Sequence, residues 1–229
     1  MGQSVRSTPL IIINFKSYLL QYDSNVDRLI ERIQRFEPEE QERLILCPAA
    51  SDLRQLRAMT RATRIQLFAQ TLASEPGTDR LTVPNLKTLD LDGALLNHPE
   101  APLSLTELRS ILAKPELRAV CVIVQSLEEL DRLLADSIVS HRLRSQLIAF
   151  EPRELIGGKI CAIEKDPAEV VRFVQKVHQI DALALLGGGI VTIAQGIMAR
   201  GSGIDGWLIS SMLLSSEGIT NLEELVQQQ

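Results

Sequence analysis

Short apolar runs recur along the whole chain, spaced roughly one βα unit apart. We interpret eight of them as β-strands: Leu10–Asn14, Arg43–Cys47, Ile65–Ala69, Ala94–Asn97, Ala119–Val124, Leu147–Glu151, Ala182–Leu186 and Trp207–Ser210. Within these runs the apolar residues follow one another instead of alternating with polar ones. Continuous apolar runs are typical of strands buried on both faces, so the pattern predicts a parallel sheet.

Amphipathic segments fill the spaces between these runs. In Asp166–His178, four valines recur at helical spacing behind the N-cap residue Asp166 and Pro167 in the first turn. Comparable patterns predict helices over Asn25–Phe36, Thr82–Leu89, Ser104–Ala113, Ser126–Asp136 and Val191–Arg200. The alternation has no linker and no shift in composition, and it predicts one α/β domain over residues 1–229, a (β/α)8 barrel. An open doubly wound sheet is the alternative, because periodicity alone does not prove that the sheet closes.

Composition excludes several classes of protein. The chain has 229 residues, of which 45% are hydrophobic, and its net charge of −5 argues against a nucleic-acid-binding surface. No apolar stretch approaches the length of a membrane span, and the first residues lack the apolar segment of a signal peptide. The odd number of cysteines and the absence of CxxC spacing favour free thiols in a reducing cytoplasm; these are Cys47, Cys121 and Cys161.

The segment QLIAFEPRELIGG carries the most specific chemistry. An acid, Glu151, directly follows an apolar strand and precedes Pro152, and the segment ends in Gly157 and Gly158. A carboxylate at the carboxyl end of a barrel strand, ahead of a loop with glycine at one end, is how such a fold presents a general base under a mobile lid. The competing interpretation is a solvated loop carboxylate without a catalytic role.

Two other strand ends supply candidate groups at the same edge of the sheet. His98 follows the run ALLN, where a neutral imidazole can donate a hydrogen bond to a developing oxyanion. Asn14 and Lys16 lie at the end of IIINFK, and on an extended chain they point to the same side. A lysine there can hold an anionic substrate or stabilise negative charge. A buried structural histidine and a surface lysine are the alternatives.

Glycines and hydroxyl groups follow the last two strands. Gly187, Gly188 and Gly189 occupy a strand-to-helix turn, where backbone N–H groups can approach a phosphate. Ser210 and Ser211 end the eighth run, and barrels commonly bind phosphate in the loops after strands seven and eight. The sequence has no HxH, HExxH or paired Cys–His spacing, so we expect no metal site. It also lacks the GxSxG motif of a serine nucleophile.

These motifs, in this order, make the chain resemble the triosephosphate isomerase family, in its short archaeal form. The resemblance extends over nearly the whole chain and rests on INFKSY, LCPAASDL, FAQ, LLNHPE, FEPRELIGG, CAIEKDPAEVV, LGGGI and GWLISS. It implies a (β/α)8 barrel of glycolysis and gluconeogenesis that interconverts dihydroxyacetone phosphate and glyceraldehyde 3-phosphate without a cofactor. It also implies a homo-oligomer, because in that family the loop after the third strand docks into a neighbouring subunit.

The resemblance implies a role for each candidate residue. Glu151 would move a proton between adjacent carbons, His98 would polarise the carbonyl group and Lys16 would counter the charge of the enediolate. Asn14 would orient the substrate, and Glu100 would support the site. The phosphate-binding groups, mainly backbone N–H groups, would belong to Gly157, Gly189, Ser210 and Ser211. The pairing of a glutamate base with a neutral histidine is the one described for the family itself.

The chain departs from the family pattern in four loops. Pro99 stands where the family has serine, which removes a hydroxyl and an N–H donor beside the base. Lys159 replaces the second hinge glycine of the implied lid, Pro152–Lys159, and we expect its restricted φ to slow or redirect closure. Met212 replaces a small residue and is expected to crowd the phosphate. In the loop after the third strand, the family motifs are replaced by Thr71, Arg80 and Leu81.

Two alternatives use the same residues. One is a barrel that binds a phosphorylated metabolite or a protein partner without turnover, if Pro99, Lys159 and Met212 prevent closure of the lid. The other is a related sugar-phosphate isomerase, or an aldolase in which Lys16 forms a Schiff base. The fold does not separate these functions, because one barrel serves many reactions.

Overall fold

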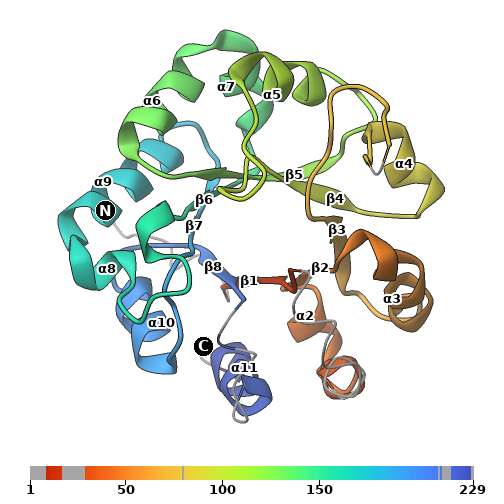
Figure 1. Cartoon of the computed structure of the whole chain (residues 1–229). Helices are drawn as coiled ribbons and strands as arrows, with labels where there is room; N and C mark the ends of the chain where they lie inside the picture. Colours follow the sequence, from red (N-terminus) through yellow and green to blue (C-terminus); the bar gives the residue numbers. More distant parts are fainter. Residues whose placement is uncertain (1–8, 17–28, 79, 211, 213–217, 228–229) are drawn as a thin grey trace.

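The computed structural model describes residues 9–16, 29–78, 80–210, 212 and 218–227, and within them eight parallel strands close into a barrel (Figure 1). The strands are β1 (Leu10–Asn14), β2 (Leu44–Cys47), β3 (Gln66–Ala69), β4 (Gly93–Leu96), β5 (Ala119–Val124), β6 (Leu147–Phe150), β7 (Leu183–Leu186) and β8 (Gly206–Ile209). Each strand pairs with the next along the chain, and β8 pairs with β1. The predicted (β/α)8 barrel is therefore confirmed, and the open-sheet alternative is wrong.

Helices surround the barrel on its outside (Figure 1). Five match predicted segments: α4 (Val83–Thr88), α5 (Leu105–Leu112), α6 (Leu127–Ala135), α9 (Pro167–His178) and α10 (Ile193–Arg200). Of the predicted helix Asn25–Phe36, residues 29–33 are helical, and 25–28 lie outside the described residues.

The structure adds elements that the pattern did not predict: α2 (Pro38–Gln41), η2 (Ala50–Asp52), α3 (Leu53–Thr60), α7 (Ser137–Leu143), η3 (Arg153–Leu155), α8 (Ala162–Lys165) and α11 (Gly218–Gln227). The longest unpredicted helix between two strands, α3, buries only Leu53, Leu56 and Thr60. Such a sparse apolar face does not stand out in the sequence.

Apolar side chains form two layers. One cluster fills the inside of the barrel, with Ile12, Ile45, Phe68, Cys121 and Leu185 among its members. A larger cluster joins the outer face of the strands to the helices. Both faces of the strands are therefore buried, which explains the continuous apolar runs and leaves the loops at the strand ends to carry polar chemistry.

Candidate active site

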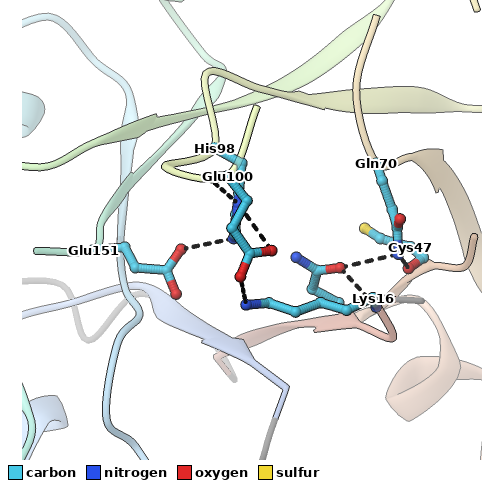
Figure 2. Close-up of polar contacts among 7 residues, drawn as sticks. Lys16, Cys47, Gln70, His98, Glu100 and Glu151 are labelled. Atoms are coloured by element: carbon cyan, nitrogen blue, oxygen red, sulfur yellow. Dashed lines mark hydrogen bonds and ion pairs between the residues drawn. The ribbon is translucent and has the colours of Figure 1, made fainter. Parts of the chain in front are cut away.

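The acid–base candidates meet at the carboxyl ends of three strands (Figure 2). Asn14 is the last residue of β1, His98 follows β4 by two residues and Glu151 follows β6 by one. The predicted strands extended to Asn97 and Glu151, but the observed β4 and β6 each end one residue earlier. His98 and Glu151 are buried, with 5% and 7% of their surfaces exposed. The barrel thus brings together residues far apart in the sequence in a place shielded from water.

The imidazole of His98 is a neutral hydrogen-bond donor. Its Nδ1 accepts the backbone N–H of Glu100 at 3.1 Å, which places the proton of the neutral ring on Nε2. Burial and the positive charge of Lys16 lower the pKa of His98 to about 4, against the opposing charge of Glu100. His98 is therefore uncharged at neutral pH, and Nε2–H faces Glu151 (Figure 2).

The carboxyl group of Glu151 is a stronger base than an ordinary glutamate. Burial raises its pKa to about 7, although the charge of Lys16 and a hydrogen bond from the Gly188 backbone both act to lower it. A group whose pKa lies near the working pH is ionised often enough to accept a proton and strong enough to remove one.

Two buried polar atoms of this pair are unsatisfied. Glu151 Oε2 and His98 Nε2 lie 3.4 Å apart, and neither has a hydrogen-bond partner among the described residues. An unpaired buried polar group costs on the order of 1–3 kcal/mol, so such atoms call for an explanation. A donor and an acceptor held side by side in this way are suited to a carbonyl oxygen and the carbon next to it.

Lys16 reaches the site from a turn and not from an extended strand. β1 ends at Asn14, and Lys16 has a φ of 49°. The prediction that Asn14 and Lys16 share one side of an extended chain is therefore wrong. Instead, the Lys16 backbone N–H donates to Asn14 Oδ1 at 3.2 Å, which closes the turn.

The ammonium group of Lys16 is paired with a carboxylate. Lys16 Nζ donates to Glu100 Oε1 at 2.8 Å (Figure 2). Burial acts to raise the pKa of Glu100, but the hydrogen bond and charge of Lys16 lower it overall. Glu100 therefore stays ionised, holds the ammonium near His98 through its side chain and fixes the ring tautomer through its backbone.

Gln70 is a site residue that the sequence reasoning did not single out. Its Nε2 donates to Asn14 Oδ1 at 3.1 Å and to the Cys47 carbonyl at 3.0 Å, so it fixes the Asn14 side chain (Figure 2). The available signal was a polar residue directly after the apolar run of β3. A cavity of about 390 Å³ is lined by Asn14, Lys16, Gln70, Thr71, His98, Glu100 and Ala101.

Asn97 is a second residue that the sequence reasoning missed. It has a φ of 61° and is 3% exposed, and its Nδ2 donates to the Ile123 carbonyl at 2.9 Å and to Glu129 Oε1 at 2.8 Å. Its Oδ1 accepts the Leu103 backbone N–H at 2.9 Å. Asn97 thereby holds the loop that carries His98. Asparagine tolerates positive φ better than most residues, so an asparagine at the end of an apolar run was the signal that the sequence offered.

The phosphate candidates differ in how the structure arranges them. Gly189 has a φ of 78°, and a Cβ there would lie 2.2 Å from the Ile160 carbonyl oxygen, so only glycine fits. Gly157 has a φ of 73° and is exposed. A Cβ there would meet no described atom within 4 Å, so Gly157 does not take part in the contact between Gly189 and Ile160. Ser210 directly follows β8, and Ser211 lies outside the described residues.

The glycine turn also contacts the base and the implied lid. A Cβ on Gly188 would lie 3.3 Å from Cγ of Glu151, 3.6 Å from Cβ of Leu155 and 3.6 Å from the Pro152 carbonyl oxygen. The turn after β7 therefore packs against the base and the start of the lid segment.

The departures from the family pattern occupy three different environments. Lys159 is exposed and does not have a positive φ, so lysine meets no left-handed strain in this conformation. Met212 is 1% exposed and belongs to the apolar cluster between strands and helices. Pro99 is buried beside His98.

In the described part of the chain, no three His, Cys, Asp or Glu side chains are grouped so that they could hold a metal ion. Among the helices of that part, none is long and apolar enough to cross a membrane.

A closed barrel with a buried carboxyl group of raised pKa, a neutral imidazole and a lysine at its mouth is typical of enzymes of the acid–base type. The family model of triosephosphate isomerase matches residues 9–228. The triosephosphate isomerase of Thermoplasma volcanium is 25% identical over 220 residues, which cover 95% of this chain and 99% of that protein. The triosephosphate isomerase of Pyrobaculum arsenaticum is 30% identical over 187 residues, which cover 80% of each protein.

Among solved structures, the crystal structure of triosephosphate isomerase from Bartonella henselae matches with a TM-score of 0.68 at 17% identity, covering 97% of this chain and 100% of that one. This similarity concerns the fold alone. The match to the family model covers nearly the whole chain, and the chain belongs to the triosephosphate isomerase family.

Proposed function

We propose that Glu151, His98 and Lys16 carry out the reaction of the family, the interconversion of dihydroxyacetone phosphate and glyceraldehyde 3-phosphate. Glu151 removes a proton from the carbon next to the carbonyl group, and an enediolate forms. The same carboxyl group then returns a proton to the adjacent carbon, while the hydroxyl proton passes through Nε2 of His98 to the former carbonyl oxygen, so that the carbonyl and hydroxyl groups exchange places. The reaction moves hydrogen without net oxidation, so it requires no redox cofactor.

His98 stabilises the oxygen on which charge develops. Its Nε2–H donates to the carbonyl oxygen of the substrate and then to the enediolate, and it does so as a neutral group. The hydrogen bond from Glu100 to Nδ1 supports this role, because it leaves Nε2 as the donor.

Lys16 counters the negative charge of the enediolate and of the phosphate, and Glu100 keeps it in place. This ion pair argues against the aldolase alternative. An amine that forms a Schiff base must reach the carbonyl carbon of the substrate, whereas the hydrogen bond to Glu100 holds Lys16 Nζ on that carboxylate.

The remaining site residues bind the substrate. Asn14, fixed by Gln70, orients the triose, and the lid segment Pro152–Lys159 closes over it. The phosphate-binding groups in this proposal are those of Gly157, Gly189, Ser210 and Ser211. The left-handed backbone of the glycine turn supports this, because such turns direct N–H groups toward anions.

The single observation that carries the proposal is the unsatisfied pair Glu151 Oε2 and His98 Nε2, 3.4 Å apart and buried. An acid–base reaction of this kind needs one atom that accepts the proton from carbon and one that donates a hydrogen bond to the carbonyl oxygen. These two atoms must lie close enough together to reach neighbouring atoms of one substrate molecule. A barrel that only bound phosphate would need neither atom.

A coupled assay with glyceraldehyde 3-phosphate tests the assignment of the base. The account predicts turnover in the unmodified chain and a loss of about 10³-fold or more in Glu151→Gln. Glu154→Gln is the matched control, because Glu154 lies in the same segment but is exposed and paired with Lys165. Equal activity of the two variants would contradict the assignment. No turnover in a folded chain that binds inorganic phosphate would favour the non-catalytic barrel.

We also propose that the chain forms one domain over residues 1–229 and acts in the cytoplasm as a homo-oligomer. A second cavity of about 320 Å³ adjoins the active site and shares Gln70, Thr71 and Ala101 with it. Its apolar wall, which includes Leu53, Leu81 and Leu103, offers a contact surface for a neighbouring subunit. Sedimentation equilibrium tests this proposal, and a monomer at micromolar concentration would contradict it.

A further inference from the structure

Gln195 has more hydrogen bonds than its position in a helix requires. It lies in the first turn of α10, directly after the glycine turn, and is 6% exposed. Its Oε1 accepts the backbone N–H groups of Val191 at 2.9 Å and Thr192 at 3.1 Å. These bonds belong to a capping box, in which Gln or Glu at this position stabilises the start of a helix.

The other end of the Gln195 amide reaches the end of the implied lid. Because two N–H donors face Oε1, the amide orientation is fixed and Nε2 must point the other way. Nε2 donates to the Lys159 carbonyl at 2.8 Å and to Glu164 Oε2 at 2.8 Å. Glu164 Oε2 also accepts the Cys161 backbone N–H at 2.9 Å. One buried side chain therefore holds the chain on both sides of Ile160.

A second contact joins the same two segments. Gly189 approaches Ile160 so closely that a Cβ would lie 2.2 Å from the Ile160 carbonyl oxygen. The residues that directly follow the lid segment thus rest on the turn after β7. In contrast, Gly157 and Lys159 within the segment are exposed.

We infer that Gln195 is a positioning residue that clamps the last residue of the lid segment, Lys159, and the two residues after it, Ile160 and Cys161, to the glycine turn after β7. The clamp keeps the carboxyl-terminal end of the lid fixed to the turn while the exposed part of the lid moves. When the lid closes, the lid and the turn therefore contact the same phosphate group of the substrate. This inference rests on the proposed function. Gln195 touches no reacting atom and acts through the lid and the turn.

Two matched variants separate the clamp from the helix cap. Gln195→Glu keeps an oxygen for the cap, because glutamate is also a normal capping-box residue. It replaces the Nε2 donor with an oxygen that faces the Lys159 carbonyl and the Glu164 carboxylate. Thr192→Ala does the reverse, because it removes the side-chain acceptor of the Gln195 backbone N–H and leaves Nε2 in place.

The first readouts are the steady-state constants and the affinity for inorganic phosphate. Gln195→Glu is expected to lower kcat/KM by about tenfold, shared between kcat and KM, because altered hinges change both constants. The Kd for inorganic phosphate, from calorimetry, is expected to rise by a similar factor. Thr192→Ala is expected to lower Tm and to leave both quantities within about twofold of the unmodified chain.

The second readout is inorganic phosphate released per isomerisation, which does not depend on the fraction of folded protein. When the lid closes poorly, the enediolate can lose its phosphate by elimination. Its charged oxygen becomes a carbonyl oxygen, a new carbon–carbon double bond forms to the carbon that carried the phosphate, and the carbon–oxygen bond to phosphate breaks with the electron pair leaving on the phosphate. The remaining enol tautomerises to a 2-oxoaldehyde. Gln195→Glu is expected to raise this ratio several-fold. When Gln195→Glu is combined with Glu164→Gln, the amide at position 164 again donates to a carboxylate, now at position 195. The ratio of released phosphate to isomerisation and the Kd for inorganic phosphate should then return part of the way to the values of the unmodified chain.

Unchanged phosphate release and unchanged Kd in Gln195→Glu would overturn the clamp. Equal effects of Gln195→Glu and Thr192→Ala would overturn it as well, since the cap alone would then explain both. If the unmodified chain does not isomerise glyceraldehyde 3-phosphate, the proposed function fails, but the Kd comparison between the two variants still decides whether the clamp exists.

Discussion

The two sides of the active site use different parts of the chain. On the acid–base side, side chains act: His98, Glu100, Glu151 and Lys16 lie close together, and burial together with their mutual charges shifts the pKa values of His98 and Glu151. On the lid side, the contacts between the glycine turn and the lid segment are mostly backbone contacts. Charge and burial control the first side, whereas backbone conformation controls the second. Substitutions on the two sides should therefore change different kinetic and binding constants, and not only change them by different amounts.

The largest effect is expected on the acid–base side, in Glu151→Asp. Shortening the side chain by one methylene withdraws the base from the substrate carbon, and we expect kcat to fall by about 10²–10³-fold. Binding of a phosphate-bearing competitive inhibitor should stay within about twofold. Steady-state kinetics and calorimetry measure the two quantities. Equal losses of kcat and inhibitor binding would show that Glu151 shapes the site and does not act as the base.

On the lid side, Gly189→Ala is expected to reverse that pattern. The added Cβ meets the Ile160 carbonyl oxygen, and the φ of 78° is unfavourable for alanine, so the turn and the lid must separate. We expect KM and the inhibitor Kd to rise by about tenfold or more, with a smaller change in kcat. The matched control is Gly201→Ala, at a glycine with a φ of −61° whose Cβ would lie 3.3 Å from the Met198 carbonyl oxygen. A fall in kcat alone would contradict the division between the two sides.

The two acid–base groups, Glu151 and His98, should also differ in how they respond to pH. Since the pKa of Glu151 is raised to about 7, the base is lost by protonation as the pH falls below that value. The pKa of His98 is lowered to about 4, so the imidazole stays neutral over the same range. We expect kcat/KM to be flat above pH 8 and to fall about tenfold per unit below pH 6.

The substrate phosphate also titrates, with a pKa near about 6. Inhibitor binding measured over the same pH range provides the correction for it. A rate that stays constant from pH 8 to pH 5 after this correction would contradict the raised pKa of Glu151.

The smallest effect is expected for Lys159→Gly. Lysine at this position has no positive φ, and its carbonyl already accepts from Gln195. We therefore expect kcat to change by less than about twofold, since a glycine would add freedom that the backbone does not use. Steady-state kinetics provide the measurement of kcat. A several-fold rise in kcat would mean that closure passes through a left-handed conformation at this residue.

The difference between the side chains of the acid–base side and the backbone contacts of the lid side also explains which features could be predicted from the sequence. All eight strands and the positions of Glu151, His98 and Lys16 follow from apolar runs that end in polar residues, because the barrel buries both faces of each strand. Lys16 shows the limit, since the turn that aims it depends on its hydrogen bond to Asn14.

Gln70, Asn97 and Gln195 were missed for a related reason. Each is an ordinary amide in the sequence, and its role in the site depends on at least one partner more than 20 residues away. Short helices such as α8 were missed because four residues carry too little periodicity to detect.

In the proposed reaction, Glu151 moves a proton while His98 stabilises the enediolate. Isomerisation of glyceraldehyde 3-phosphate in D₂O, followed by NMR of the product, tests this directly, because a proton carried by a carboxyl group can exchange with solvent. We expect deuterium on the carbon that receives the proton in the unmodified chain, and product formation slower by about 10³-fold or more in Glu151→Gln. Rapid product formation without deuterium would indicate direct hydride transfer between the carbons and would contradict the claim. So would undiminished incorporation in Glu151→Gln.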